Sequence, residues 1–233
     1  MHAVILAGGK GRRLKPYTTV FPKPLMPLGD YPILEVVIRQ LHKCGYRKLT
    51  LCVGYQHELF RAFFGEGEKW GVELKYVLED QPLGTAGPLK LIDDLPKHFL
   101  LMNGDILTDL DFAEPMCFHR EGGNAATILT HERSVDVNYG TLEYDEAGIL
   151  HSYTEKPSLK YHVSMGVYVL SRETVECIPR GQAFDFPDLI NALLKQKSKV
   201  VCYPYGGYWQ DIGRPDDYEQ AVNDFENLAN NWL

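Results

Sequence analysis

The chain reads His2-Ala-Val-Ile-Leu-Ala-Gly-Gly-Lys-Gly-Arg-Arg-Leu-Lys-Pro-Tyr-Thr-Thr-Val-Phe-Pro-Lys-Pro24 near its N-terminus. The first five of these residues are typical of a short buried strand, and a glycine-rich loop follows them directly. Glycines let backbone N–H groups close around an oxyanion. The loop also carries five cations, Lys10, Arg12, Arg13, Lys15 and Lys23. Together these features indicate a strongly anionic ligand, for which a polyphosphate is the natural candidate.

The loop does not match the two common phosphate-binding patterns. A dinucleotide fingerprint requires Gly-x-Gly-x-x-Gly, but Leu14 stands where the third glycine should be. A Walker loop requires Gly-Lys followed by Ser or Thr, which the chain lacks. Three prolines restrict the backbone of the segment, namely Pro16, Pro22 and Pro24. The pattern therefore favours a structured anion site over a flexible basic turn.

The first half of the sequence alternates short apolar runs with amphipathic segments. We expect a helix at 33–41, with Asp30 as its N-cap, Pro32 in its first turn and Gly45 beyond its end. Further strands are expected at 48–53, 73–78 and 99–102, and helices at 56–64 and after Thr85. This alternation favours an α/β fold with a mostly parallel sheet, in which ligands bind beyond the carboxyl ends of the strands.

Beyond about Asn124 the pattern becomes rich in strands. These strands are expected at 125–131, 140–144, 149–154 and 162–170. A helix at 187–195, a strand at 199–203 and a helix at 216–228 follow. We interpret the chain as a single domain, 1–233, in which residues 1–123 form one half of a cleft and residues 124–233 add a β-rich second half.

The composition limits the possible partners. The chain has 233 residues, 45% of them hydrophobic, and a formal net charge of -7, so we expect a globular protein that does not bind nucleic acid. Its five cysteines include no Cys-x-x-Cys pair, which argues against a disulfide framework or a zinc site. The sequence shows neither a signal peptide nor an apolar run long enough to cross a membrane, so a cytoplasmic location is expected.

At the level of motifs the chain resembles the sugar-1-phosphate nucleotidylyltransferases. Residues 6–24 match this family's Leu-Ala-Gly-Gly-x-Gly-x-Arg-Leu, x-Pro-x-Thr and Pro-Lys-Pro signature almost throughout. Five further motifs follow in family order, at 82–87, 104–105, 139–140, 155–157 and 209–213. The resemblance implies a Rossmann-like three-layer sandwich that transfers a nucleotidyl group from a nucleoside triphosphate to a sugar 1-phosphate. The left-handed β-helix that extends several relatives is expected to be absent.

The resemblance also implies roles for individual residues. Arg13 and Lys23 would act on the triphosphate as catalytic cations, and Asp105 and Asp211 would hold Mg²⁺. The nucleotide would lie against Leu6, Ala7, Gly8, Gly9, Gly11, Glu79, Pro82, Gly84 and Thr85. The sugar phosphate would contact Tyr139, Gly140, Glu155, Lys156, Ser164 and Gly166. Ser164 replaces the Asn of an Asn-Ala-Gly motif common in the family, which suggests an atypical acceptor. Lys10, Arg12 and Lys15 are left unassigned.

Glu79 and the overall sequence pattern indicate a base and an acceptor. A carboxylate at Glu79 can only accept hydrogen bonds, so it suits the N–H groups of guanine and favours GTP. The overall sequence pattern is similar to that of mannose- or heptose-1-phosphate guanylyltransferases. The alternatives are UTP or dTTP as donor, phosphocholine as acceptor, or a non-catalytic homologue that binds a nucleotide sugar. A homodimer is expected, and Trp70, Trp209 and Trp232 are interpreted as core or interface residues. Asp109 and Asp111 are expected in turns or helix caps.

Overall fold

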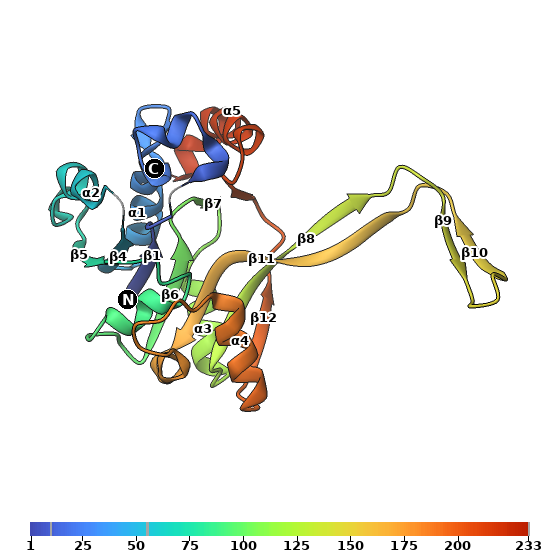
Figure 1. Ribbon diagram of the computed structural model, residues 1–233. Coiled ribbons are helices and arrows are strands. Elements are labelled where there is room, and N and C mark those ends of the chain that lie inside the picture. The colour runs from blue at the N-terminus through green and yellow to red at the C-terminus, as the bar shows by residue number, and fades with distance from the viewer. Residues whose placement is uncertain (10, 55, 233) are drawn as a thin grey trace.

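A seven-stranded mixed sheet forms the centre of the molecule (Figure 1). The computed structural model describes residues 1–9, 11–54 and 56–232. The spatial order of the strands is β12-β8-β11-β6-β1-β4-β5. In chain order these are β1 (His2–Leu6), β4 (Lys48–Val53), β5 (Glu73–Leu78), β6 (His98–Asn103), β8 (Ala126–Asp136), β11 (Ser158–Ser171) and β12 (Val200–Pro204). Within this sheet β11 runs antiparallel to both of its neighbours, and the other recorded pairings are parallel. The expected mostly parallel sheet is confirmed.

Helices cover both faces of the sheet. They are α1 (Ile33–Lys43), α2 (His57–Phe64), α3 (Ala113–Glu121), α4 (Phe186–Lys195) and α5 (Pro215–Trp232). Side chains alternate along a strand, so Ala3 and Ile5 of β1 pack with residues of α1 and α2, whereas Val4 packs on the opposite side with α4. A third cluster joins α5 to the glycine loop through Leu14 and Phe225. The result is the expected three-layer arrangement.

The start of α1 differs from the sequence-based expectation. Asp30 does not cap this helix, because it lies in the turn between two short paired strands, β2 (Pro27–Leu28) and β3 (Tyr31–Pro32). The N-cap is Pro32, whose backbone is extended and whose side chain offers no acceptor. The C-terminal end is as expected, since the backbone of Gly45 has φ +85°. Likewise, Asp111 Oδ1 accepts a hydrogen bond from Ala113 N–H at the start of α3.

A two-stranded arm projects from the body of the molecule (Figure 1). The outer parts of β8 and β11 continue as a paired ribbon to Asp136 and Ser158, beyond the ends expected from the sequence. A hairpin of β9 (Thr141–Tyr144) and β10 (Leu150–Thr154) forms the tip. We define the arm as residues 131–163, because the pairing of β8 with β12 ends at Thr130.

Two short strands connect the C-terminal segment to the centre of the fold. β7 (Ile106–Thr108) pairs antiparallel with β13 (Trp209–Asp211). Among the described residues, no helix is both long and apolar enough to span a lipid bilayer.

Candidate functional site

A cavity of about 810 Å³ opens beyond the carboxyl ends of the parallel strands. Its walls come from the glycine loop after β1, the segment after β5 and the residues after β6. All nine residues predicted to contact the nucleotide line it, namely Leu6, Ala7, Gly8, Gly9, Gly11, Glu79, Pro82, Gly84 and Thr85. Arg13, Lys23 and Asp105 line it as well. The structure therefore brings the first half of the predicted site together.

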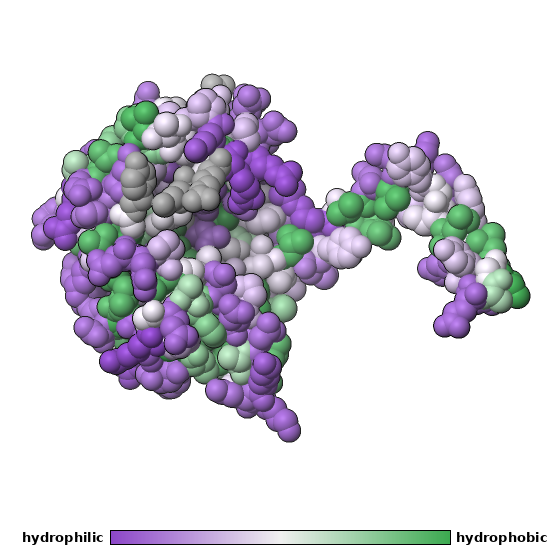
Figure 2. All heavy atoms as spheres, in the orientation of Figure 1, coloured by the Kyte–Doolittle hydropathy of each residue, from purple (hydrophilic) through white to green (hydrophobic). Residues whose placement is uncertain are grey.

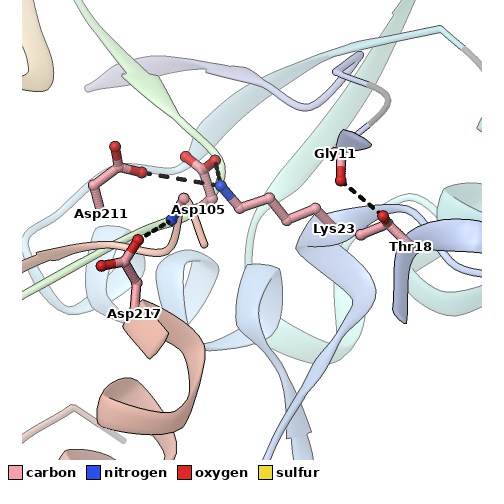
Figure 3. Close-up of polar contacts among 7 residues, drawn as sticks. Gly11, Thr18, Lys23, Asp105, Asp211 and Asp217 are labelled. Atoms are coloured by element: carbon pink, nitrogen blue, oxygen red, sulfur yellow. Dashed lines mark hydrogen bonds and ion pairs between the residues drawn. The ribbon is translucent and has the colours of Figure 1, made fainter. Parts of the chain in front are cut away.

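The glycine loop is held in shape by its own hydrogen bonds. Gly11 adopts φ +56°, and its carbonyl oxygen accepts bonds from Leu14 N–H at 2.9 Å and from the Thr18 hydroxyl at 2.7 Å (Figure 3). A Cβ added at Gly11 would lie 2.9 Å from Thr18 Cγ2. The position therefore requires glycine for both its conformation and its close packing.

Lys23, Asp105 and Asp211 form a charged cluster at one end of the cavity (Figure 3). The side chain of Lys23 is almost fully buried, and its ammonium group donates a hydrogen bond to Asp105 Oδ2. The distance from Lys23 Nζ to Asp211 Oδ1 is 3.9 Å. Asp211 of β13 pairs with Ile106 of β7, and this pairing brings the Asp211 side chain beside Asp105.

The two carboxylates influence each other. Burial raises the pKa of Asp211 above its ordinary value, and the nearby charge of Asp105 raises it further, whereas Lys23 and Arg13 lower it. Asp105 Oδ1 is buried and has no hydrogen-bond partner among the described residues. A buried carboxylate oxygen without a partner, close to a second carboxylate, fits a Mg²⁺ ion whose other ligands are substrate oxygens and water. The described residues contain no group of three or more His, Cys, Asp or Glu side chains that could hold a metal alone.

Arg13 lies on the rim of the same end. It is exposed, and its guanidinium approaches Gly213, where an added Cβ would lie 3.5 Å from Arg13 Nη1. The N–H of Gly213 donates to Asp217 Oδ2 at 3.1 Å, which fixes the start of α5 beside the loop. Of the unassigned cations, Lys15 is exposed, Lys10 lies outside the described residues, and nothing is described of the Arg12 side chain.

Glu79 stands at the other end of the cavity, at the end of β5. Its Oε2 accepts a hydrogen bond from Leu83 N–H at 3.1 Å, and its Oε1 faces Gly8, where an added Cβ would lie only 2.7 Å away. Burial raises the pKa of this carboxyl above its ordinary value, partly opposed by the bond from Leu83. Thr85 is bound to the second half of the chain, because its N–H and hydroxyl both donate to Asp185.

Comparison with known proteins identifies the family of the chain. A family model described as nucleotidyl transferase matches residues 2–227. The chain belongs to the nucleotidyl transferase family. It is 33% identical to the mannose-1-phosphate guanylyltransferase catalytic subunit beta of Drosophila pseudoobscura pseudoobscura, over 93% of this chain and 60% of that protein. It is 31% identical to the UTP–glucose-1-phosphate uridylyltransferase of Synechocystis sp., over 95% of this chain and 62% of that protein. The chain thus spans about three fifths of the length of these relatives.

Solved structures agree with this assignment. The crystal structure of HddC from Yersinia pseudotuberculosis superposes with a TM-score of 0.75 at 27% identity, and its complex with GMP-PN with a TM-score of 0.74 at 26% identity. Each comparison covers 96% of this chain and 99% of HddC. The Rossmann-like sandwich expected from the sequence is therefore the fold of this nucleotidyl transferase chain.

The predicted acceptor residues are divided between two places. Gly166 lies beside the cavity, since an added Cβ would be 2.7 Å from Nδ2 of Asn103, a lining residue, and Ser164 precedes it on β11. In contrast, four of them, Tyr139, Gly140, Glu155 and Lys156, lie on the arm of this nucleotidyl transferase chain. Ribbon pairing from Ser164 to Ser158 carries the chain about 20 Å outward at ~3.3 Å per residue. The structure does not bring the four arm residues to the cavity of their own chain (Figure 1).

Among the described residues that line the cavity, Asn103 and Gly54 lie outside the segments that the sequence indicated. Asn103 ends β6 and Gly54 follows β4, and both line the cavity. The rule that ligands bind beyond the carboxyl ends of parallel strands would have indicated both positions. Trp70 packs in the core against Phe64, as expected. Trp209 is half-buried and donates to Met165 O, while the side chain of Trp232 lies outside the described residues.

Proposed function

We propose that this chain transfers a nucleotidyl group from a nucleoside triphosphate, with GTP as the best candidate, to a sugar 1-phosphate of the mannose or heptose type. The products are a nucleotide sugar and pyrophosphate. One observation carries the proposal: the glycine loop, Arg13, Lys23 and Asp105 line one cavity, so phosphate-binding and metal-binding groups converge there. We expect the reaction to take place in the cytoplasm, where nucleoside triphosphates are available.

The reaction needs no covalent enzyme intermediate. An oxygen of the sugar phosphate attacks the α-phosphorus in line, the new P–O bond forms, and the bond to the bridging oxygen breaks with its electron pair leaving on pyrophosphate. Negative charge grows on that leaving group. Arg13 and Lys23 would donate hydrogen bonds to the phosphate oxygens and stabilise this charge more in the transition state than in the ground state.

Asp105 and Asp211 are the residues that would hold Mg²⁺. When bound, the ion would supply positive charge to the phosphate oxygens and help to orient them. In the described structure the ammonium group of Lys23 lies between the two carboxylates and neutralises part of their charge. Nucleotide phosphates entering the cavity would offer this ammonium group a second set of acceptors.

Glu79 supports GTP as the donor. Within the described part of the chain, its Oε1 has no hydrogen-bond partner, while Oε2 is engaged by Leu83. A free carboxylate oxygen at the end of the cavity can accept N–H groups from the Watson–Crick edge of guanine, whereas uracil or thymine presents one N–H between two carbonyls. UTP remains the second candidate, because similarity to the uridylyltransferase nearly equals similarity to the guanylyltransferase.

Pyrophosphate release tests the proposal directly. The assay pairs GTP, UTP, dTTP and ATP with mannose, heptose and glucose 1-phosphates, each with Mg²⁺. We expect the fastest release with GTP and a mannose- or heptose-type acceptor. Faster release with UTP or dTTP would overturn the choice of base, and no release with any pair would support a non-catalytic nucleotide-sugar-binding homologue.

A further inference from the structure

Both ribbons of the arm have one apolar face and one polar face. In the outer ribbon, Val135 pairs with Leu159, and the same face carries Tyr161, whose paired residue Arg133 lies over the Trp209 ring of its own chain. The opposite face carries Glu132, Ser134 and Lys160, with an ion pair between Lys160 and Glu132. In the tip hairpin, Leu142 pairs with Tyr153 and Tyr144 with Leu150 on one face, whereas Glu143 pairs with Ser152 on the other.

The apolar faces of the arm are open to solvent in the single chain. The exposed fraction is 52% for Val135, 51% for Leu142, 67% for Tyr144 and 61% for Tyr153. Figure 2 shows apolar surface along the arm, well away from the body. An isolated two-stranded ribbon is marginally stable in water, and an antiparallel sheet with alternating polarity normally packs its apolar face against something. The arm therefore has the pattern of an element that is covered by another surface.

The rim of the cavity offers a surface of matching character. Tyr17, Val20 and Phe21 are exposed, and they lie between Leu14 and Lys23, which line the cavity. The loop around them carries the cations of the N-terminal signature and no carboxylate. The outer end of the arm is acidic in turn, because residues 136–158 contain five carboxylates, Asp136, Glu143, Asp145, Glu146 and Glu155, against one lysine. Apolar contact and charge complementarity therefore both favour packing of an arm against a cavity rim.

The described residues that line the cavity of a single chain leave no cation for the acceptor. Among the described lining residues the cations are Arg13 and Lys23, and the proposed mechanism uses both on the triphosphate. Lys156 could serve the sugar phosphate, but the ribbon holds it away from its own cavity. A second copy of the chain can supply it. Exchange of identical arms about a two-fold axis is a simple route to a closed dimer, because each arm then covers the other copy.

We propose that two copies exchange arms, so that the tip hairpin of one copy packs on the Tyr17–Phe21 rim of the other and delivers Glu155 and Lys156 to its cavity. Each complete site then combines the nucleotide half of one copy with the acceptor residues of its partner. The catalytic part of this inference rests on the proposed function, whereas the exchange of arms does not.

Hybrid dimers test the shared site. Asp105→Asn disables the nucleotide half and Lys156→Ala disables the arm, and each is expected to lower activity roughly a hundredfold. The two variants are co-expressed with different affinity tags, and the hybrid is isolated by both tags in sequence. With exchanged arms, one of its two sites combines an intact body with an intact arm, so the hybrid should recover about half of the wild-type activity. Activity that stays at the level of the parents would overturn the proposal.

A reciprocal hybrid serves as the matched control. Here both substitutions are placed on one chain, and this chain is paired with a wild-type copy. Exchanged arms leave a defect in each site, so this hybrid should be nearly inactive. Self-contained sites would instead leave the wild-type copy fully active, which would contradict the proposal. Thermal melting of each variant establishes that it is folded before activity is compared.

The molecular mass in solution tests the exchange without any catalysis. Wild-type protein is expected at twice the 26.5 kDa of the chain by sedimentation in reducing buffer. Leu142→Ser, on the apolar face of β9, should weaken the dimer roughly tenfold or more, whereas Glu143→Ser, on the opposite face, removes one of the five carboxylates and no apolar contact, so it should weaken the dimer much less. A monomeric wild-type protein, or equal effects of the two substitutions, would overturn the exchange of arms. If no nucleotide supports pyrophosphate release, the proposed function fails and this measurement still decides whether the arm dimerises.

Discussion

Replacing Glu79 by Gln is the sharpest test of how the cavity selects a base. In the wild-type chain Oε2 accepts from Leu83 N–H at 3.1 Å, so the amide oxygen of a Gln should turn toward Leu83 to keep that bond. The amide NH₂ would then occupy the position of Oε1 and face the N–H groups of guanine. The NH₂ group of the Gln and the N–H groups of guanine are all hydrogen-bond donors, whereas in the wild-type chain the guanine N–H groups face a charged acceptor.

The expected size of the effect follows from this geometry. A hydrogen bond to a charged group contributes about 1.5–3 kcal/mol, so kcat/KM for GTP should fall roughly 10- to 100-fold. The carbonyl groups of uracil can accept from the new NH₂ group, so kcat/KM for UTP should hold or rise. The measurement is the ratio of kcat/KM for GTP to that for UTP, obtained from pyrophosphate release with one acceptor.

Glu73→Gln provides the matched control. Glu73 begins the same strand that Glu79 follows, it is exposed, and its substitution removes the same charge far from the cavity. The GTP to UTP ratio should be unchanged in this variant. An unchanged ratio in Glu79→Gln as well would refute the assignment of the carboxylate to the base.

Three further predictions concern the cluster, the base end and the core. Lys23→Met should lower kcat about a hundredfold or more through the loss of one charged contact at the leaving group, and a change confined to KM would contradict this role. Burial raises the pKa of Glu79, so on acidification this carboxylate should be protonated at a higher pH than an ordinary glutamate, and the preference for GTP over UTP should decline there. A GTP to UTP ratio of kcat/KM that stays constant down to the ordinary pKa of a glutamate would disprove this. Burial lowers the pKa of His119 to about 4, so His119 favours folding fully above pH 6.5 and loses this contribution as the pH falls toward 4. The loss is of the order of 3 kcal/mol, and urea unfolding at pH 7.5 and 4.5 should show a smaller pH dependence for His119→Gln than for the wild type.

Local sequence patterns were sufficient to predict those elements whose structure depends mainly on neighbouring residues. The strands at 48–53 and 73–78 are found as expected, because each is a compact apolar or alternating run with polar or turn residues at its ends. The glycine loop and Asp105 were also accessible, since both directly follow buried strands. Sequence reasoning failed at Asp30, where pairing of β2 with β3 overrides the preference of an aspartate for a helix cap.

The arm could not be derived from local pattern. Residues on either side of the tip alternate in polarity, and this alternation predicts strands without indicating what covers their apolar face. The sequence therefore placed Glu155 and Lys156 at the acceptor by resemblance, while the long unbroken pairing of β8 with β11 holds them on the arm. Their contact with substrate stays a prediction.

The pairing of β7 with β13 has a consequence for how the protein is made. Asp105 is synthesised in the first half of the chain, but Asp211 joins it only when the C-terminal segment has left the ribosome and paired with β7. Contacts between residues so distant in sequence form late in folding, because closing a long loop must precede them. A nascent chain can therefore assemble its glycine loop early, while the two-carboxylate cluster is completed only after β13 has been synthesised and has paired with β7.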